Sequence, residues 1–203
     1  MPKASKNSVF AQTITAYLAA INALDRDVLG RRPGLSCDGE AVTVPLLGDL
    51  HRVTANAITD RRGRQPSHAV SVVICRYLLH RSGPVVEGGE LLSYKDFQGS
   101  APYASAFTAT VEEPLAAAFA GRLPRLRRAA GDMGGCEVTV DFGCDYAGWF
   151  QALPELFLTL LFYDQDEEFP ARCTLLFQRR AVALLDMESL ALVGDQLRRR
   201  LLD

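Results

Sequence analysis

The stretch LFYDQDEEFPARCTLLF, residues 161–177, crowds four carboxylates between two apolar runs. The first run begins earlier, at LFLTLLFY (residues 156–163), and its apolar residues would occupy both faces of an extended chain. This pattern predicts a strand at the centre of a sheet. The second run, RCTLLFQRR (residues 172–180), predicts a partner strand, and Pro170 interrupts pairing because it has no N–H to donate. The stretch therefore predicts two antiparallel strands joined by an acidic turn.

The flanking residues predict the rest of the C-terminal half. CEVTVDF (residues 136–142) alternates as a half-buried strand does, and AVALL (residues 181–185) completes the antiparallel set. We expect CDYAGWFQALPE, residues 144–155, to be irregular. Asp186 predicts the N-cap of a C-terminal helix over residues 187–202. This helix carries one apolar stripe, formed by Leu190, Val193, Leu197 and Leu201.

The N-terminal half begins with apolar residues at steps of three and four, which predict a helix over residues 8–29. Two β-rich stretches follow, EAVTVPLL (residues 40–47) and LHRVTANAIT (residues 50–59). Gly48 and Asp49 separate them, so we expect a hairpin with a two-residue turn.

Two or three helices are predicted in the middle of the chain. One runs from Ser67, a good N-cap residue, to His80, and Gly83-Pro84 is its expected stop. Another spans residues 103–119, where Pro114 either breaks the helix or marks the first turn of a new one. LPRLRRAA adds a further helical turn or two. The chain is therefore predicted to be a single α+β domain over residues 1–203, with a mainly antiparallel sheet packed against several helices.

Composition and charge exclude several classes of protein. The 203 residues are 48% hydrophobic and 23% charged, with a formal net charge of −2. A binder of nucleic acid or of anionic membranes shows a basic excess, so we expect neither partner. No apolar run approaches the roughly 18 residues needed to cross a bilayer. The N-terminal residues lack the apolar core of a secretory signal. The five cysteines are scattered without a CxxC pair, which favours a reduced, cytoplasmic protein without a cysteine cluster.

The order of several segments resembles the prokaryotic domain of unknown function 3786 family. The most specific pieces are residues 166–170 (DEEFP) followed by residues 175–177 (LLF), and the loop from Ser93 to Gly99. The resemblance extends over about residues 10 to 200. It implies a context in anaerobic bacteria and archaea, where some relatives carry an added cysteine-rich iron–sulfur segment that this chain lacks. It implies no reaction and no ligand.

The loop LLSYKDFQGSAPY, residues 91–103, is the most site-like irregular stretch. Polar groups beside aromatic rings suit a small-molecule pocket, since a few polar groups orient a ligand that apolar surfaces enclose. The alternative is a loop that leads into a helix, with its side chains satisfying backbone donors. The candidate ligand-binding residues here are Ser93, Tyr94, Lys95, Asp96 and Tyr103.

The acidic residues 164–168 also have two interpretations. Asp164, Asp166 and Glu168 are spaced to point one way from an extended chain, which suits magnesium, calcium or manganese. The alternative, which we favour, is a solvated turn whose charges keep two sticky strands from aggregating. Asp166, Glu167 and Glu168 are kept as candidate ligand-binding residues, and no metal ligand is assigned.

Other candidates are weaker. His68 and Cys75 are seven residues apart on one helix face, yet a metal would need two more ligands. Cys136 and Cys144 could form a redox pair, but no histidine is assigned to either as a base.

The sequence thus favours a ligand-binding or accessory domain, linked by family context to anaerobic redox or cofactor metabolism. Its expected partner is a small molecule, and no cofactor is identified. The alternatives are a metal-dependent enzyme using the acidic cluster Asp164–Glu168, or an interaction module that forms a homodimer.

Overall fold

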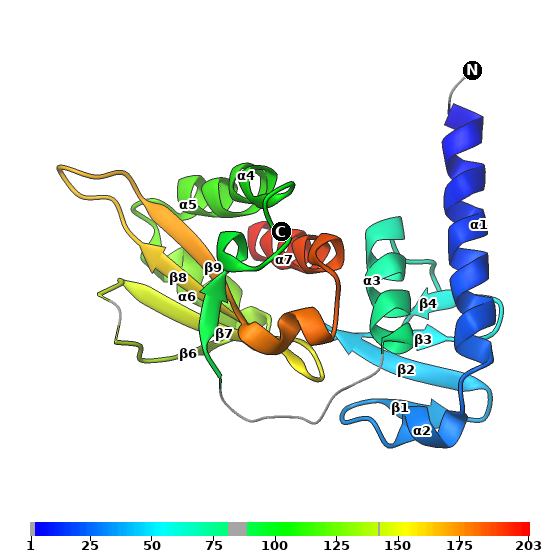
Figure 1. The fold of residues 1–203 in the computed structure, drawn as a ribbon. Helices are drawn as coiled ribbons and strands as arrows, with labels where there is room; N and C mark the ends of the chain where they lie inside the picture. Colours follow the sequence, from blue (N-terminus) through cyan, green and yellow to red (C-terminus); the bar gives the residue numbers. More distant parts are fainter. Residues whose placement is uncertain (1–2, 81–88, 142) are drawn as a thin grey trace.

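The computed structural model of the chain describes residues 3–80, 89–141 and 143–203, with side chains from Phe10 onward. Helices and two antiparallel sheets confirm the predicted α+β class (Figure 1). In Figure 1 the four-stranded sheet and the first helices lie on one side and the five-stranded sheet on the other. The extent of the predicted single domain, residues 1–203, stays a prediction.

The N-terminal helix differs from its predicted span. Helix α1 covers Lys3–Asn22, and a separate short helix α2 covers Arg26–Gly30, where one helix over residues 8–29 was expected. The break occurs because the Asp25 side chain accepts a hydrogen bond from the Asp27 backbone N–H at 2.8 Å. Aspartate favours this N-cap role over a helix interior.

The predicted hairpin is confirmed within the first sheet. Strand β2 (Ala41–Leu46) pairs with β3 (Asp49–Val53), and Leu46 lies opposite Asp49. The turn therefore consists of Leu47 and Gly48, which both have positive φ, one residue earlier than expected. The two outer strands are β1 (Ser36–Asp38) and β4 (Ile58–Asp60).

Helix α3 (His68–Leu79) packs between the two halves of the molecule. Its predicted N-cap is confirmed, since Ser67 Oγ accepts from the Val70 N–H at 3.3 Å. The expected stop at Gly83-Pro84 lies outside the described residues. Side chains of α1 and of the last helix, α7 (Met187–Leu202), cover α3 on two sides.

The second sheet has the strand order β5-β9-β8-β7-β6. Strand β8 (Leu156–Tyr163) is in the middle, as the apolar run predicted, and it pairs with β9 (Arg172–Gln178) through the acidic turn. The remaining strands are β5 (Leu91–Ser93), β6 (Cys136–Glu137) and β7 (Tyr146–Leu153).

Three predictions for this sheet were wrong. Residues 144–155 contain β7, whose broken apolar pattern hides a strand that pairs with β6 and β8. Of the described residues 136–141, only the first two form a strand; the chain leaves the ladder after Val138, whose N–H still donates to the Ala147 carbonyl at 2.9 Å. Phe142 lies outside the described residues. Residues 181–185 belong to a 3₁₀ segment, η3 (Arg179–Ala183), and the residues after it, because the chain must turn there to reach the last helix.

A nearly continuous helical stretch follows the short 3₁₀ turn η1 (Tyr94–Asp96). Helix α4 (Ala104–Phe107) passes into a π-helical turn, η2 (Thr108–Glu112), and then into α5 (Glu113–Phe119). Pro114 stands in the first turn of α5, where its missing N–H costs little, as one of the two sequence alternatives proposed. Helix α6 (Leu123–Asp132) follows.

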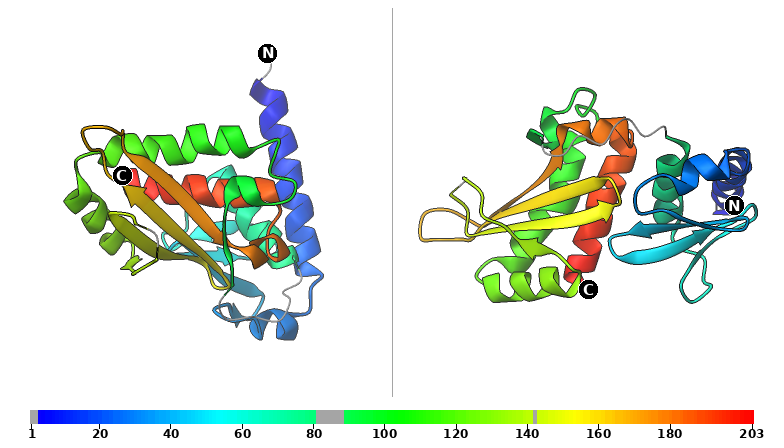
Figure 2. Two further views of the ribbon diagram at one scale, coloured as in Figure 1. Left: turned by 60° about the vertical axis from the view of Figure 1, so that its left-hand side comes forward. Right: turned by 90° about the horizontal axis from the view of Figure 1, so that it is seen from below.

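Helices α4 to α7 gather on one face of the five-stranded sheet (Figure 2). The predicted N-cap of α7 is confirmed, since Asp186 Oδ1 accepts from the Ser189 N–H at 2.7 Å. One continuous core of buried side chains connects this layer with the first sheet, from Val44 through Leu160 to Leu197. None of the helices in the described part of the chain is long and apolar enough to cross a lipid bilayer.

Candidate functional site

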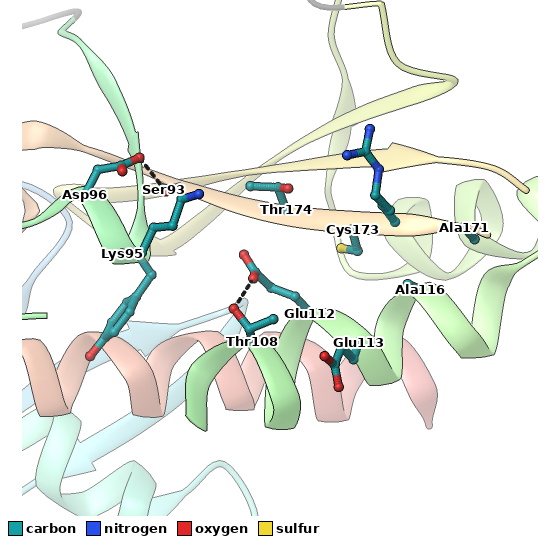
Figure 3. Close-up of a pocket in the computed structure, with 12 residues that line it drawn as sticks. Ser93, Lys95, Asp96, Thr108, Glu112, Glu113, Ala116, Ala171, Cys173 and Thr174 are labelled. Carbon is teal, nitrogen blue, oxygen red and sulfur yellow. Dashed lines mark hydrogen bonds between the residues drawn. The ribbon is translucent and has the colours of Figure 1, made fainter. Parts of the chain in front are cut away.

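A cleft of about 580 Å³ opens where three segments meet (Figure 3). The end of β5 and the turn η1 contribute Ser93–Asp96, and the π-helical turn and α5 contribute one wall. Ala171 and the first three residues of β9 form the other wall. Four of the predicted site residues, Ser93, Tyr94, Lys95 and Asp96, therefore line one cavity. We call it the β9 cleft.

Glu112 forms the centre of the helical wall. In Figure 3 its carboxylate points from the helix toward β9. Its Oε1 accepts from the Leu175 backbone N–H at 3.0 Å, and its Oε2 accepts from Thr108 Oγ1 at 2.9 Å. A π-helical turn often marks a functional site, and here it carries the glutamate that satisfies a strand N–H.

On the side away from β8, strand β9 has a neighbouring strand for only part of its length. Strand β5 pairs with residues 176–178, and the Arg179 N–H bonds to the Glu90 carbonyl at 2.8 Å just beyond. In the described part of the chain, no strand continues this pairing along residues 172–175. The wall of the cleft is therefore a free sheet edge.

The loop opposite this edge, Ser93–Asp96, is held in place by aromatic packing of Tyr94. Tyr94 stacks on Phe107 with ring centroids 4.2 Å apart, and its hydroxyl donates to the Met187 carbonyl at 2.6 Å. Gly194 of α7 makes this possible, since a Cβ there would lie 2.6 Å from the Phe107 ring. Burial raises the pKa of Tyr94 to about 12, so the phenol stays protonated. Tyr94 thus supports the cleft as an anchored, neutral side chain.

Polar groups of the same loop bond to one another. Ser93 Oγ donates to Asp96 Oδ2, and Ser100 Oγ donates to the Lys95 carbonyl at 2.8 Å. Neither bond satisfies a backbone donor, which the helix-entry alternative expected, and both leave the Lys95 ammonium group available to the cleft. The ligand-binding interpretation of the loop stays a prediction.

The cleft contains both signs of charge. Lys95 and Arg172 bring positive charge, and no ion pair involves either of them in the part of the chain that the structure describes. The Arg172 guanidinium lies over the Tyr163 ring, 5.1 Å from its centroid. Asp96, Glu112 and Glu113 bring negative charge.

Cys173 also lines the cleft, but its thiol is not poised to react. The residue is buried, and burial, followed by the nearby Glu112 carboxylate, raises the pKa of the thiol well above its usual value. Because the thiolate is the nucleophile, this environment keeps Cys173 unreactive.

The other predicted site residues lie outside the cleft. Tyr103 stands at the start of α4 and is 40% exposed. Asp166, Glu167 and Glu168 are exposed in the turn between β8 and β9. Asp166 Oδ1 accepts from the N–H groups of Phe169 at 2.7 Å and Glu168 at 2.8 Å, and these bonds lower the pKa of Asp166. The structure thus does not bring the two sets of candidates together.

Metal-ligating side chains are dispersed in the same way. In residues 3–80, 89–141 and 143–203, no three histidine, cysteine or acidic side chains are grouped to hold a metal ion. His68 packs against the Phe10 ring, with centroids 4.3 Å apart. Burial raises the pKa of Cys75 to about 12. All five cysteines are free.

Sequence reasoning placed Glu112 and Thr108 within a predicted helix and did not select them as site residues. The one local signal was Pro114, because a proline two residues later disturbs the helical hydrogen bonds around Glu112. Nothing in the sequence indicated that Leu175 would present its N–H to this carboxylate.

The chain matches the family model of the domain of unknown function (DUF3786) over residues 25–200. It therefore belongs to this family, as the resemblance of its segments indicated. No curated protein and no solved structure matches it.

Proposed function

We propose that this protein is a ligand-binding domain and that the β9 cleft is its binding site. The observation that carries the proposal is the convergence of three distant segments on one cavity of about 580 Å³. Ligand pockets in proteins have volumes of roughly 300–1,000 Å³ and place a few polar groups among apolar walls. The β9 cleft has this size and this composition.

The polar groups of the cleft are suited to binding rather than to chemistry. The Cys173 thiol is held in its protonated form, and the Tyr94 hydroxyl is occupied by the Met187 carbonyl. Lys95, Arg172 and the sheet edge instead offer charge and backbone hydrogen bonds. We therefore propose a binding or accessory role. A cytoplasmic location and a link to anaerobic redox or cofactor metabolism remain parts of this proposal.

Native mass spectrometry of gently purified protein, combined with thermal-shift screening of amino acids, dicarboxylic acids and short peptides, tests the proposal. Thr174 lines the cleft, so Thr174→Trp fills part of the cleft with a large side chain that projects from β9. Gln178→Trp is its matched control, because Gln178 lies four residues further along the same strand face and does not line the cleft.

We expect a bound mass or a ligand-dependent rise in melting temperature in the wild type and in Gln178→Trp. Thr174→Trp should lose this response while unfolding cooperatively. A ligand that binds all three proteins equally well would place the binding site elsewhere and refute the proposal.

A further inference from the structure

We propose that the ligand is an extended peptide segment that adds to the five-stranded sheet as a strand beside β9. This inference rests on the proposed function, since it identifies the class of ligand that the β9 cleft receives. Recognition of this kind uses main-chain hydrogen bonds for affinity and alternating side-chain contacts for specificity.

The backbone of β9 presents hydrogen-bonding groups to the cleft. In an antiparallel sheet, the N–H and C=O groups of alternate residues point to opposite neighbours. The N–H of Leu175 points to Glu112 and that of Arg179 points to Glu90, both away from β8. The same alternation directs the N–H and C=O of Cys173 into the cleft.

The length of the free edge fits a short peptide. Strand β5 ends at Ser93, opposite Leu176, and the cleft begins where β5 turns away into η1. Glu112 occupies the Leu175 N–H at this junction. The remaining edge, residues 171–174, spans about 13 Å at the usual rise of a strand, which accommodates about four extended residues.

Charge selects the side chains of the peptide. In Figure 3 Thr174 projects from the side of β9 opposite to Glu112. Arg172 is two residues away on the same strand and so shares this side, and Lys95 lines the same cleft. Side chains of an added strand alternate between the two sides. Acidic side chains on every second residue would therefore meet Lys95 and Arg172, whose charges are unpaired in the described part of the chain. The inferred partner is an extended segment with alternating acidic residues.

The first test uses capped peptides and the wild-type protein. Fluorescence anisotropy measures the dissociation constants of labelled VEVEV and of VKVKV, and amide NMR shifts locate the site. We expect VEVEV to bind about tenfold more tightly than VKVKV and to shift the amides of residues 171–174. Two forms of VEVEV, N-methylated at its valines or at its glutamates, should differ about tenfold in affinity, because only one set of N–H groups faces β9. Equal affinities of the two forms would exclude strand addition.

The second test changes the protein. Cys173→Pro removes the Cys173 N–H, which faces the cleft, and leaves the hydrogen bonds between β9 and β8 in place. A strand tolerates proline at such a position, because the missing N–H lies on the free edge. Cys173→Ala keeps the donor and removes the thiol. We expect about tenfold weaker binding of VEVEV to Cys173→Pro than to Cys173→Ala. If Cys173→Pro does not fold, the N-methylated peptides decide the question. Lys95→Glu combined with Arg172→Glu should reverse the preference toward VKVKV.

The outcomes separate this inference from the proposed function. If glutarate or N-acetylglutamate shifts the amides of residues 171–174 and VEVEV does not, the cleft binds a small molecule and the peptide inference is wrong. If none of these ligands affects those amides, both the inference and the proposed function fail. If VEVEV binds but shifts only other amides, strand addition at β9 is refuted.

Discussion

The two turns that flank β8 carry their acidic residues in opposite environments. The turn between β7 and β8 contains one acid, Glu155, which is only 3% exposed. The turn between β8 and β9 contains four acids, Asp164, Asp166, Glu167 and Glu168, and Figure 1 shows it projecting from the end of the sheet. The sequence drew attention to the second turn, yet the first carries the more constrained charge.

Glu155 joins the two halves of the molecule. Its Oε2 accepts from the Tyr77 hydroxyl at 3.1 Å and lies 3.4 Å from the Arg32 guanidinium. That guanidinium stacks over the Tyr77 ring, 4.3 Å from its centroid, and donates to the Tyr77 carbonyl at 2.9 Å. Burial raises the pKa of Tyr77 above its usual value, so the hydroxyl remains a donor. Segments far apart in the chain thus meet at one buried carboxylate.

Two of the acids of the outer turn accept hydrogen bonds from backbone N–H groups instead. Asp164 Oδ1 accepts from the Gly121 N–H at 2.6 Å, and Asp166 closes its own turn by accepting from Phe169. Solvent screens the repulsion between these charges. The comparison shows that burial, rather than the number of charges, decides which partners a carboxylate needs. A lone buried acid requires partners, whereas the four acids of the outer turn, three of them exposed, need only water and a few N–H groups.

The largest loss of stability is expected when an acidic residue is placed within β8, between the two turns. Leu160 is fully buried and lies opposite Leu175. Leu160→Asp buries an unpaired charge, so we expect a loss of several kcal/mol, about enough to unfold a marginally stable domain. Urea denaturation measures it, with Leu160→Met as the conservative control. An unchanged unfolding midpoint for Leu160→Asp would disprove the central position of β8.

The next largest effect is expected at the inner turn. Glu155→Ala leaves the Arg32 charge and the Tyr77 hydroxyl buried without their carboxylate. We expect unfolding free energy to fall by about 3 kcal/mol, as for other broken buried pairs. Glu155→Gln keeps an acceptor for Tyr77 and should lose less. If Glu155→Ala unfolds at the same urea concentration as the wild type, the network of Glu155, Arg32 and Tyr77 does not contribute to the stability of the fold.

A smaller difference is expected between two buried thiols. Cys173 lies near the outer turn and Cys75 lies in α3, near Tyr77 of the inner network. We expect strand ends beside an exposed turn to open more readily than a helix held by a buried network. In variants that keep one of these thiols, with the other cysteines replaced, Cys173 should be labelled about tenfold faster than Cys75 in dilute urea. Faster labelling of Cys75 would reverse the proposed order of local stability.

The smallest effect is expected at the outer turn itself. Asp166→Asn combined with Glu168→Gln keeps the side-chain acceptor that closes the turn. We expect the melting temperature to stay within about 3 °C of the wild type, as for most surface changes, and solubility to fall. Millimolar magnesium or calcium should shift neither protein. A wild-type melting temperature that rises several degrees with either cation, and a variant that lacks this rise, would restore the metal-site alternative.

The sequence by itself determined the local features of this protein. The apolar run at β8 predicted a central strand, and Ser67 and Asp186 predicted the N-caps of two helices. It also proposed Ser93, Tyr94, Lys95 and Asp96 as candidate site residues, and these four line one cleft. Such features depend on neighbouring residues, whose side chains either bury one face of the element or satisfy its first N–H groups. The family followed from the same segments.

Only the tertiary structure decided which distant groups meet. Strand β7 forms because β6 and β8 lie on either side of it, although its own apolar pattern is broken. Glu112 became part of the cleft because it faces Leu175, 63 residues away in the chain, where β5 leaves the sheet edge. Glu155 is buried for a similar reason, since Arg32 and Tyr77 reach it from the other half. Pairings of this kind depend on packing across the whole chain, which the spacing of residues within one segment does not encode.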